Sequence, residues 1–195
     1  MRPMPAFIVL LSATISGAAI AAPVTYEVDP RHSSPSFEAD HFGGLSVWRG
    51  KFTGTTGTIV LDRAAGTGTV NVSLETATVQ TGVADLDKHL KSNEFLDVEK
   101  FSKATYKGKI TRFKDGAPLE VQGDLTLHGV TKPLTLTVRS FKCMPHPMKP
   151  GKEVCGADAH GTINREDFGM TWGKNFGFDM KVGLELQVEA IAPQK

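Results

Sequence analysis

The sequence predicts an all-β protein, an antiparallel β-barrel of about eight strands with one short helical insert. Apolar and polar residues alternate with a period of two over most of the chain, which is typical of strands with one buried face. Twenty Gly and 11 Pro, together with abundant Thr and Val, suit many strands and turns. Only residues 81–96 break the alternation. There Val83, Leu86 and Leu90 are spaced by three and four, which predicts an amphipathic helix over about 82–93.

The N-terminus has the layout of a secretory signal peptide. Arg2 precedes an apolar run over residues 6–15, and small residues then lead to Ala21. We expect a signal peptide over residues 1–21, cleaved after Ala21, followed by one domain over residues 22–195. An uncleaved anchor is the alternative, although the run is short for a membrane span.

Charge excludes two classes of partner. Removal of the predicted signal peptide leaves 21 basic and 21 acidic residues. A protein without an excess of basic residues has little electrostatic affinity for the phosphate backbone of nucleic acid or for an anionic membrane surface. The sequence therefore predicts an exported, soluble protein that binds no nucleic acid and has no membrane span after signal removal.

The first half of the chain predicts five strands. They lie at residues 24–28, 37–41, 46–52, 55–61 and 70–79. The dipeptide Asp29-Pro30 interrupts the first pair, and residues 62–66 form a turn before the fifth strand.

The second half predicts five more strands. They lie at about residues 106–113, 119–127, 134–138, 157–163 and 182–188. Lys114-Asp115-Gly116 and His128-Gly129 are turn signals between them. Residues 142–155 contain three Pro, so we predict a loop there.

Strands joined by short turns, each with one apolar face, can stack as a sandwich or close into a barrel. We favour closure because a barrel of about eight strands has no exposed edge and can hold one small ligand. The predicted inward residues are mostly Val, Leu, Ile, Ala and Thr. Periodicity leaves open whether they surround a cavity or fill a solid core.

Four motifs resemble a known family. They are TYEVDPRHSSPSFEADHFG at 25–43, DLDKHLKSNEFLDVEKFSKATY at 85–106, GDLTLHGVTKPLTL at 123–136 and INREDFGM at 163–170. Together they are similar to the YceI-like family of periplasmic polyisoprenoid-binding proteins. The resemblance covers essentially the whole chain after the signal peptide.

The resemblance implies an extended, lipocalin-like barrel whose interior holds a polyisoprenoid or similar amphiphilic lipid, in a periplasmic protein that is commonly a homodimer. This chain departs from the family pattern at two places. Leu86 stands where a basic residue often precedes the Asp of the helical motif, and a Cys pair is added in the segment 142–155.

The inward strand faces, the helical insert and the segment after Ile163 supply the candidate ligand-binding residues. They are Phe37, His41, Val47, Val72, Leu74, Val83, Leu86, Asp87, His89, Leu90, Phe95, Leu125, Leu136, Arg165, Trp172 and Phe176. In this interpretation the helix is a lid, with its apolar side chains toward the cavity and Asp87 and His89 near the polar end of the ligand.

Three of the polar candidates have structural alternatives. In one alternative the helix is a structural plug, and Asp87 caps it or bonds backbone amides of the loop that follows. His41 could be a hydrogen-bonded core residue. Arg165 could bind a phosphate or carboxylate with its fork of donors, or form a salt-bridged turn with the adjacent Glu166 and Asp167.

Aromatic residues gather near predicted strand ends. Trp48, Phe52, Trp172, Phe176 and Phe178 could surround a cavity mouth or form a dimer contact. Neighbouring Gly residues suggest loops around an opening.

Cys143 and Cys155 are the two cysteines of the chain. Together with His146 and His160 they have the spacing of a tetrahedral zinc site. An exported protein with two Cys is better explained by a disulfide, so we predict a Cys143–Cys155 bond and no metal.

The sequence contains none of the G-x-S-x-G, H-E-x-x-H or P-loop motifs. We therefore expect a lipid-binding, transport or storage protein that is not an enzyme and needs no cofactor. One alternative is an enzyme acting on an isoprenoid or quinone-like lipid through His41, Asp87 and His89. Another is a filled barrel that works through its surface as an interaction or stress protein.

Overall fold

The computed structural model describes residues 22–193, which form one sheet of ten strands, one α-helix and three short 3₁₀ segments. The predicted signal peptide lies outside the described residues. The strands are β1 (Val24–Val28), β2 (Ser36–His41), β3 (Ser46–Lys51), β4 (Thr55–Asp62), β5 (Thr67–Glu75), β6 (Lys103–Lys114), β7 (Ala117–Leu127), β8 (Val130–Pro145), β9 (Glu153–Asn164) and β10 (Lys181–Ile191). The remaining elements are η1 (Thr76–Thr78), α1 (Ala84–Lys91), η2 (Arg165–Phe168) and η3 (Lys174–Phe176).

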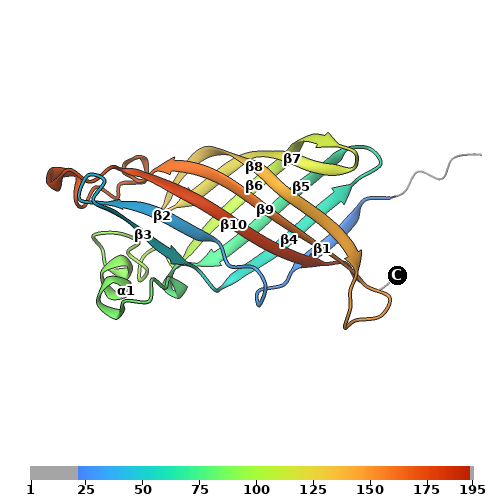
Figure 1. Cartoon of the computed structure of the whole chain (residues 1–195), viewed down its shortest axis with the longest axis horizontal. Helices are drawn as coiled ribbons and strands as arrows, with labels where there is room; N and C mark the ends of the chain where they lie inside the picture. The colour runs from blue at the N-terminus through green and yellow to red at the C-terminus, as the bar shows by residue number, and fades with distance from the viewer. Residues whose placement is uncertain (1–21, 194–195) are drawn as a thin grey trace, which may run out of the picture.

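Eight of the strands close into an antiparallel barrel, as the sequence predicts. Their order is β1-β4-β5-β6-β7-β8-β9-β10, and β10 returns to β1. The hairpin of β2 and β3 extends the sheet from the other part of β10. Figure 1 shows the result, an elongated barrel with α1, the β2–β3 turn and the segment between β9 and β10 at one end. We call this end the mouth.

The long strand β10 pairs with two different strands along the same edge, one after the other. β10 pairs with β2 near its start, where Val182 faces Ala39, and with β1 near its end, where Ala190 faces Val28. The chain between β1 and β2 is attached to β10 by Ser33, whose hydroxyl donates to the carbonyl of Glu189 and accepts from its amide. This attachment closes the barrel at the point where the partner changes.

Buried tyrosines strengthen the interior. The hydroxyl of Tyr106 donates to the carbonyl oxygens of Leu134 at 2.9 Å and Val121 at 3.2 Å, which joins β6 to two neighbouring strands. Tyr26, at the end opposite the mouth, donates to Glu153. Burial and this hydrogen bond raise the pKa of Tyr26 to about 12, so its phenol stays neutral and keeps the donor.

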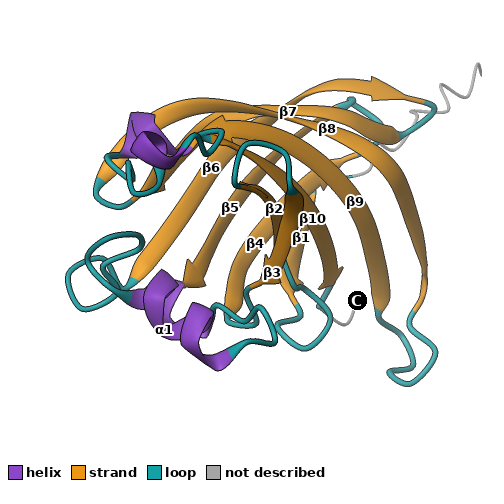
Figure 2. Cartoon of the chain, turned by 60° about the vertical axis from the view of Figure 1, so that its left-hand side comes forward, coloured by secondary structure: helices purple, strands orange, loops and turns teal. Residues whose placement is uncertain are grey.

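The predicted helix is confirmed and lies at one side of the mouth (Figures 1 and 2). None of its residues is fully buried, so it borders the barrel end without entering the core. Beneath the mouth a second apolar cluster forms from Val79, Leu96, Phe168 and Met170. No helix within residues 22–193 is long and apolar enough to cross a membrane.

The prediction that residues 142–155 form a loop is wrong. β8 continues to Pro145, and β9 begins at Glu153, so only 146–152 leave the sheet. Proline removes a single donor, and at a strand end that loss costs little. Across the turn, the amide of His146 donates to the carbonyl of Lys152 at 2.9 Å and completes a hairpin.

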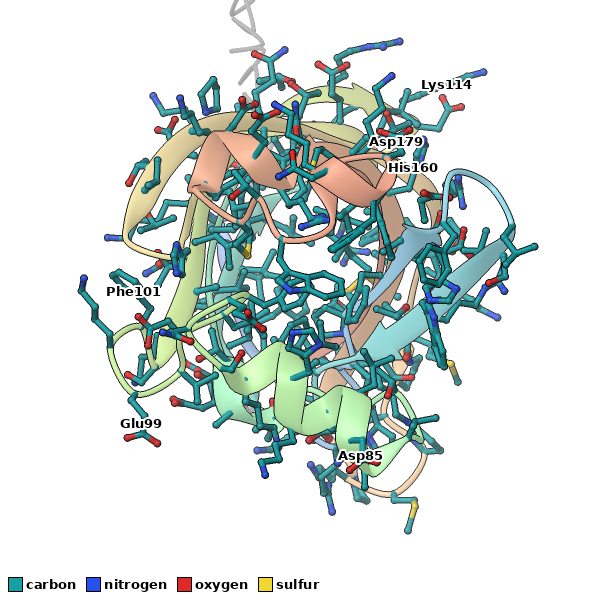
Figure 3. All side chains as sticks on the ribbon, turned by 90° about the vertical axis from the view of Figure 1, so that its left-hand side faces the viewer. Asp85, Glu99, Phe101, Lys114, His160 and Asp179 are labelled. Carbon is teal, nitrogen blue, oxygen red and sulfur yellow. A yellow bond between two sulfur atoms is a disulfide. The ribbon has the colours of Figure 1, made fainter. Side chains whose placement is uncertain are left out.

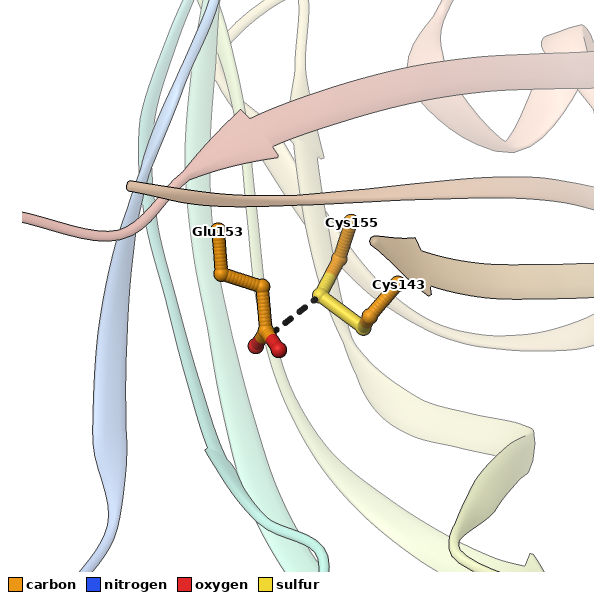
Figure 4. A group of neighbouring side chains, drawn as sticks. All are labelled: Cys143, Glu153 and Cys155. Carbon is orange, nitrogen blue, oxygen red and sulfur yellow. Dashed lines mark hydrogen bonds between the residues drawn. A yellow bond between two sulfur atoms is a disulfide. The ribbon is translucent and has the colours of Figure 1, made fainter. Parts of the chain in front are cut away.

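The predicted disulfide joins this hairpin. Cys143 and Cys155 face each other directly on β8 and β9, and their sulfurs are bonded (Figure 4). The carboxylate of Glu153 lies beside Cys155, with its oxygen 3.9 Å from Sγ. With both sulfurs joined in this bond, neither is available as a thiolate ligand for zinc, and the acidic group beside them is Glu153, not His146 or His160.

Replacement of both cysteines by Ser is expected to lower the free energy of unfolding by about 3 kcal/mol, because the bond closes a short loop and restricts the unfolded chain. Urea unfolding of the double variant and of wild type with and without reductant measures this. If reductant changes neither the mass nor the stability of wild type, the disulfide is absent in solution.

The Asp29 carboxyl should make the free energy of unfolding depend on pH in the acidic range. Burial alone would raise its pKa, but hydrogen bonds from Arg31 and His32 outweigh burial and lower the pKa from 3.8 to about 2. The folded state therefore gains stability from ionised Asp29 above pH 3.8 and loses it as pH falls toward 2. We expect Asp29→Asn to be less stable at neutral pH and to lose this part of the acid dependence.

Chemical unfolding across this pH window, with Asp85→Asn as control, tests the Asp29 prediction. Asp85 is an exposed carboxylate on α1. An unchanged acid profile in Asp29→Asn would contradict it.

Candidate functional site: an apolar cavity in the barrel

The barrel is hollow. A cavity of about 530 Å³ runs through its interior, within the size range of small-molecule sites. At the end opposite the mouth its wall includes Tyr26, Leu61, Cys155 and Ala190, all of which are buried. Periodicity left open whether the inward side chains surround a cavity or fill a core. They do both: a cluster of buried side chains packs together, and a cavity remains beside it.

The cavity opens at the mouth. Phe42 and Val83 both line it, yet they are 54% and 43% exposed to solvent. Figure 3 looks into this end of the barrel, with α1 on one side and the segment between β9 and β10 on the other; the labelled Asp85 and Glu99 lie outside the opening. A ligand can reach the interior from this end.

The wall is almost entirely apolar. Among its few polar side chains, Thr55 Oγ1 and Ser73 Oγ are buried and have no hydrogen-bond partner within the described part of the chain. The remaining surface of the cavity therefore favours an apolar guest.

The Phe37 ring lies in the cavity wall, directly against Gly50 of β3. A Cβ at Gly50 would lie 2.5 Å from the Phe37 ring, so only glycine lets this ring lie over β3. Phe37 then meets Phe52 with ring centroids 6.0 Å apart. These contacts form the part of the wall beneath the β2–β3 hairpin.

Aromatic rings surround the mouth. His41 contacts Phe42, Trp48 and Phe178 edge to face or nearly so, with centroids 4.3 to 5.9 Å apart. Trp172 lies 5.7 Å from Phe178 and joins this group to a second one.

The second aromatic group lies beside α1. His89 is 4.7 Å from Trp172 and 4.9 Å from Phe95, centroid to centroid. Together the two groups form an aromatic rim around the opening, as one of the two sequence interpretations expects.

The helix presents apolar residues and one histidine to the cavity. Val83, Leu86, His89 and Leu90 all line it. His89 Nε2 lies 2.6 Å from a carboxylate oxygen of Glu94. This arrangement is compatible with the lid interpretation.

Asp87 has the structural role that the sequence left open. Its Oδ1 accepts from both the amide and the hydroxyl of Thr81, each at 2.6 Å. The hydroxyl bond is the main reason that the pKa of Asp87 is lowered. Asp87 thus secures the chain that leads into α1, and the expectation that it bonds the loop after the helix is wrong.

Arg165 is the buried cation of the site. It is 7% exposed and lines the cavity. Nη1 donates to the carbonyl of Met170 at 2.9 Å and Nη2 to that of Trp172 at 2.6 Å. Its guanidinium carbon lies 5.5 Å from the centre of the Phe95 ring. Burial lowers the pKa of Arg165, which still carries its charge at neutral pH.

The salt-bridged turn expected as an alternative for Arg165 is not formed. Glu166 pairs with Lys174 instead, and none of the ion pairs within residues 22–193 includes Arg165. The side chain of Arg165 turns inward while those of its neighbours stay nearer the surface.

Most predicted ligand-binding residues line the cavity, and three do not. The wall includes Phe37, His41, Val72, Leu74, Val83, Leu86, His89, Leu90, Phe95, Leu125, Leu136, Arg165 and Trp172. Val47 is half exposed on the outer face of β3, because Trp48 takes the inward position. Asp87 is turned to Thr81, and Phe176 is 65% exposed.

Sequence reasoning missed several wall residues. Tyr26 and Tyr106 lie in predicted strands and line the cavity, although they are not among the predicted ligand-binding residues. Phe42, Met170 and Phe178 lie in irregular segments at the mouth, where no periodicity indicates which side chains point inward.

The candidate catalytic residues are not joined into a unit. Among the described residues, no hydrogen bond connects His41, Asp87 and His89; Asp87 bonds Thr81, and His89 faces Glu94. His41 is bonded to Ser46, with Nδ1 and Oγ 3.4 Å apart.

Comparison with known proteins identifies relatives over most of the chain. A family model described as the YceI-like domain matches residues 26–190. Protein YceI of Salmonella arizonae is 36% identical over 157 residues, which cover 80% of each chain.

Solved structures share the fold. A YCEI protein of Campylobacter jejuni is 26% identical, with a TM-score of 0.63 over 77% of this chain and 88% of that one. A polyisoprenoid binding domain from Saccharophagus degradans has a TM-score of 0.62 over 87% and 99% of the two chains, and at 16% identity the likeness is one of fold alone.

A bulky residue should fit the hollow interior and block it. We expect Val72→Trp and Leu136→Trp to abolish uptake of an apolar dye such as Nile red. At the partly buried Val72 the free energy of unfolding should fall by less than about 1 kcal/mol, whereas at Leu136, which is buried in the core cluster, it should fall by the usual cost of overpacking, about 1–3 kcal/mol. Fluorescence titration and urea unfolding measure the two effects.

Thr137→Trp is the matched control, because Thr137 is exposed on the outer face of β8 next to Leu136. A severe loss of stability in the two inward variants with dye uptake intact would indicate a packed core.

Proposed function

The chain belongs to the YceI-like family, and from this premise we propose that it binds a polyisoprenoid or a similar long amphiphilic lipid in its cavity, as a carrier or store in the periplasm. The single observation that carries the proposal is the apolar cavity, closed at the Tyr26 end and open at the aromatic rim. Its shape suits a chain that enters end first.

The apolar wall accounts for affinity without a specific head group. Each methylene removed from water contributes about 0.8 kcal/mol, so a long tail can outweigh the cost of ordering it. The guanidinium of Arg165 is then available to orient the guest.

Two further observations support the lipid and the compartment. The fold neighbour from Saccharophagus degradans is described as a polyisoprenoid binding domain. The Cys143–Cys155 disulfide suits an oxidising compartment, in keeping with the N-terminal pattern of a signal peptide. Homodimer formation stays a prediction.

We favour binding over catalysis because the three candidate catalytic residues are held apart by separate partners. Nucleophile, base and orienting group would have to meet for a reaction. Conversion of a bound isoprenoid that is lost in His89→Ala, with binding retained, would favour the enzyme instead.

Organic extraction of the natively purified protein, followed by mass spectrometry, is expected to release a long-chain lipid, and the stripped protein should take up added geranylgeraniol. Val72→Trp, purified in parallel, should release little. An empty extract together with no uptake of added isoprenoid would overturn the proposal.

A further inference from the structure

Arg165 places a full positive charge in the wall of an apolar cavity without an acidic partner. It is more than nine-tenths buried. Two other cations near the mouth are paired, Lys174 with Glu166 and Arg49 with Glu38, whereas no ion pair within residues 22–193 includes Arg165.

The contacts that Arg165 does make leave much of its binding capacity free. A guanidinium has five N–H donors in a planar fork. Two of them reach the carbonyls of Met170 and Trp172, and the Phe95 ring lies near the guanidinium. Carbonyl dipoles and a ring offset only part of the cost of burying a charge, and an anion would offset far more.

The position of Arg165 also defines an orientation. It directly follows β9 at the mouth, the end that α1 borders (Figure 1). From there the apolar wall extends to Tyr26, Cys155 and Ala190 at the closed end. A molecule with one anionic end at Arg165 would therefore have its tail along the whole cavity.

We propose that Arg165 binds the anionic end, a phosphate or carboxylate, of an amphiphile whose apolar tail fills the barrel. This inference rests on the proposed function and narrows its ligand class to lipids with an acidic terminus. The guanidinium fork matches two oxygens of such a group at once. His89, which lines the same end of the cavity, lies close to Phe95 and Trp172 and so borders the same position.

A purely structural role for Arg165 makes a different prediction. Its two backbone bonds hold the segment that carries Trp172. If that were its only role, the protein would not distinguish a charged lipid from a neutral one of the same tail. Loss of Arg165 would then weaken both alike.

The test compares geranylgeranyl phosphate with geranylgeraniol, which share one tail and differ in the charged end. Dissociation constants are measured by displacement of Nile red from lipid-stripped protein. We expect wild type to bind the phosphate about 10- to 100-fold more tightly than the alcohol, the range for hydrogen bonds to a charged group. Geranylgeranoic acid, tested in the same way, shows whether a carboxylate serves as well as a phosphate.

Arg165→Gln should remove the preference for the phosphate over the alcohol, even where loss of the bonds to Met170 and Trp172 weakens both lipids somewhat. Arg165→Lys should keep part of the preference because the charge remains. Arg49→Gln is the matched control, since Arg49 is an exposed, paired cation on β3; its preference should equal that of wild type. If Arg165→Gln does not fold, Arg165→Lys decides, because a preference equal to that of wild type in this variant would contradict a role for the guanidinium fork.

Equal affinity of wild type for the phosphate and the alcohol would overturn this inference and leave lipid binding intact. The same holds if Arg165→Gln weakens both ligands equally. Binding of neither lipid would instead overturn the proposed function itself.

Discussion

Closure of the sheet is the constraint on which the rest of the molecule depends. Once β10 pairs with β1, eight strands fix the width of the interior. Small inward residues, among them Ala104, Ala157 and Ala159, leave that width partly unfilled. A sandwich of the same strands could collapse onto these residues, but a closed barrel cannot, and the cavity is the consequence.

The two ends of the barrel differ in chemistry, and this difference gives the cavity a direction. The end with the disulfide is closed by buried side chains and by the contact of Tyr26 with Glu153. The mouth has the aromatic rim, the half-exposed α1 and the buried charge of Arg165. An apolar chain is favoured everywhere along the wall, whereas a polar group finds partners at few places.

Much of the fold could be predicted because local patterns determine it. Alternation located the strands, three-and-four spacing located α1, and turn residues located the hairpins at Asp115 and His128, both of which have positive φ. The segment 142–155 was misjudged because the pairing of Cys143 with Cys155 across β8 and β9 is a long-range property that three prolines conceal.

The site was less predictable, for physical reasons. Periodicity tells which face a residue occupies, so a one-residue shift placed Val47 inside when Trp48 is there. Periodicity carries no information on how much of the interior the side chains fill, so a hollow barrel and a packed one give the same sequence pattern. The pairing of charges is likewise spatial: Glu166 adjoins Arg165 in sequence but bonds Lys174.

The hollow itself can be tested most directly by locating a guest in it. A crystal of the lipid-stripped protein soaked with an alkyl chain that has bromine at its tail end gives anomalous density at the bromine alone. We expect that density deep in the barrel, beside Tyr26 and Ala190. Density confined to the outer surface, with the interior occupied by the protein's own side chains, would contradict a lipid-binding cavity.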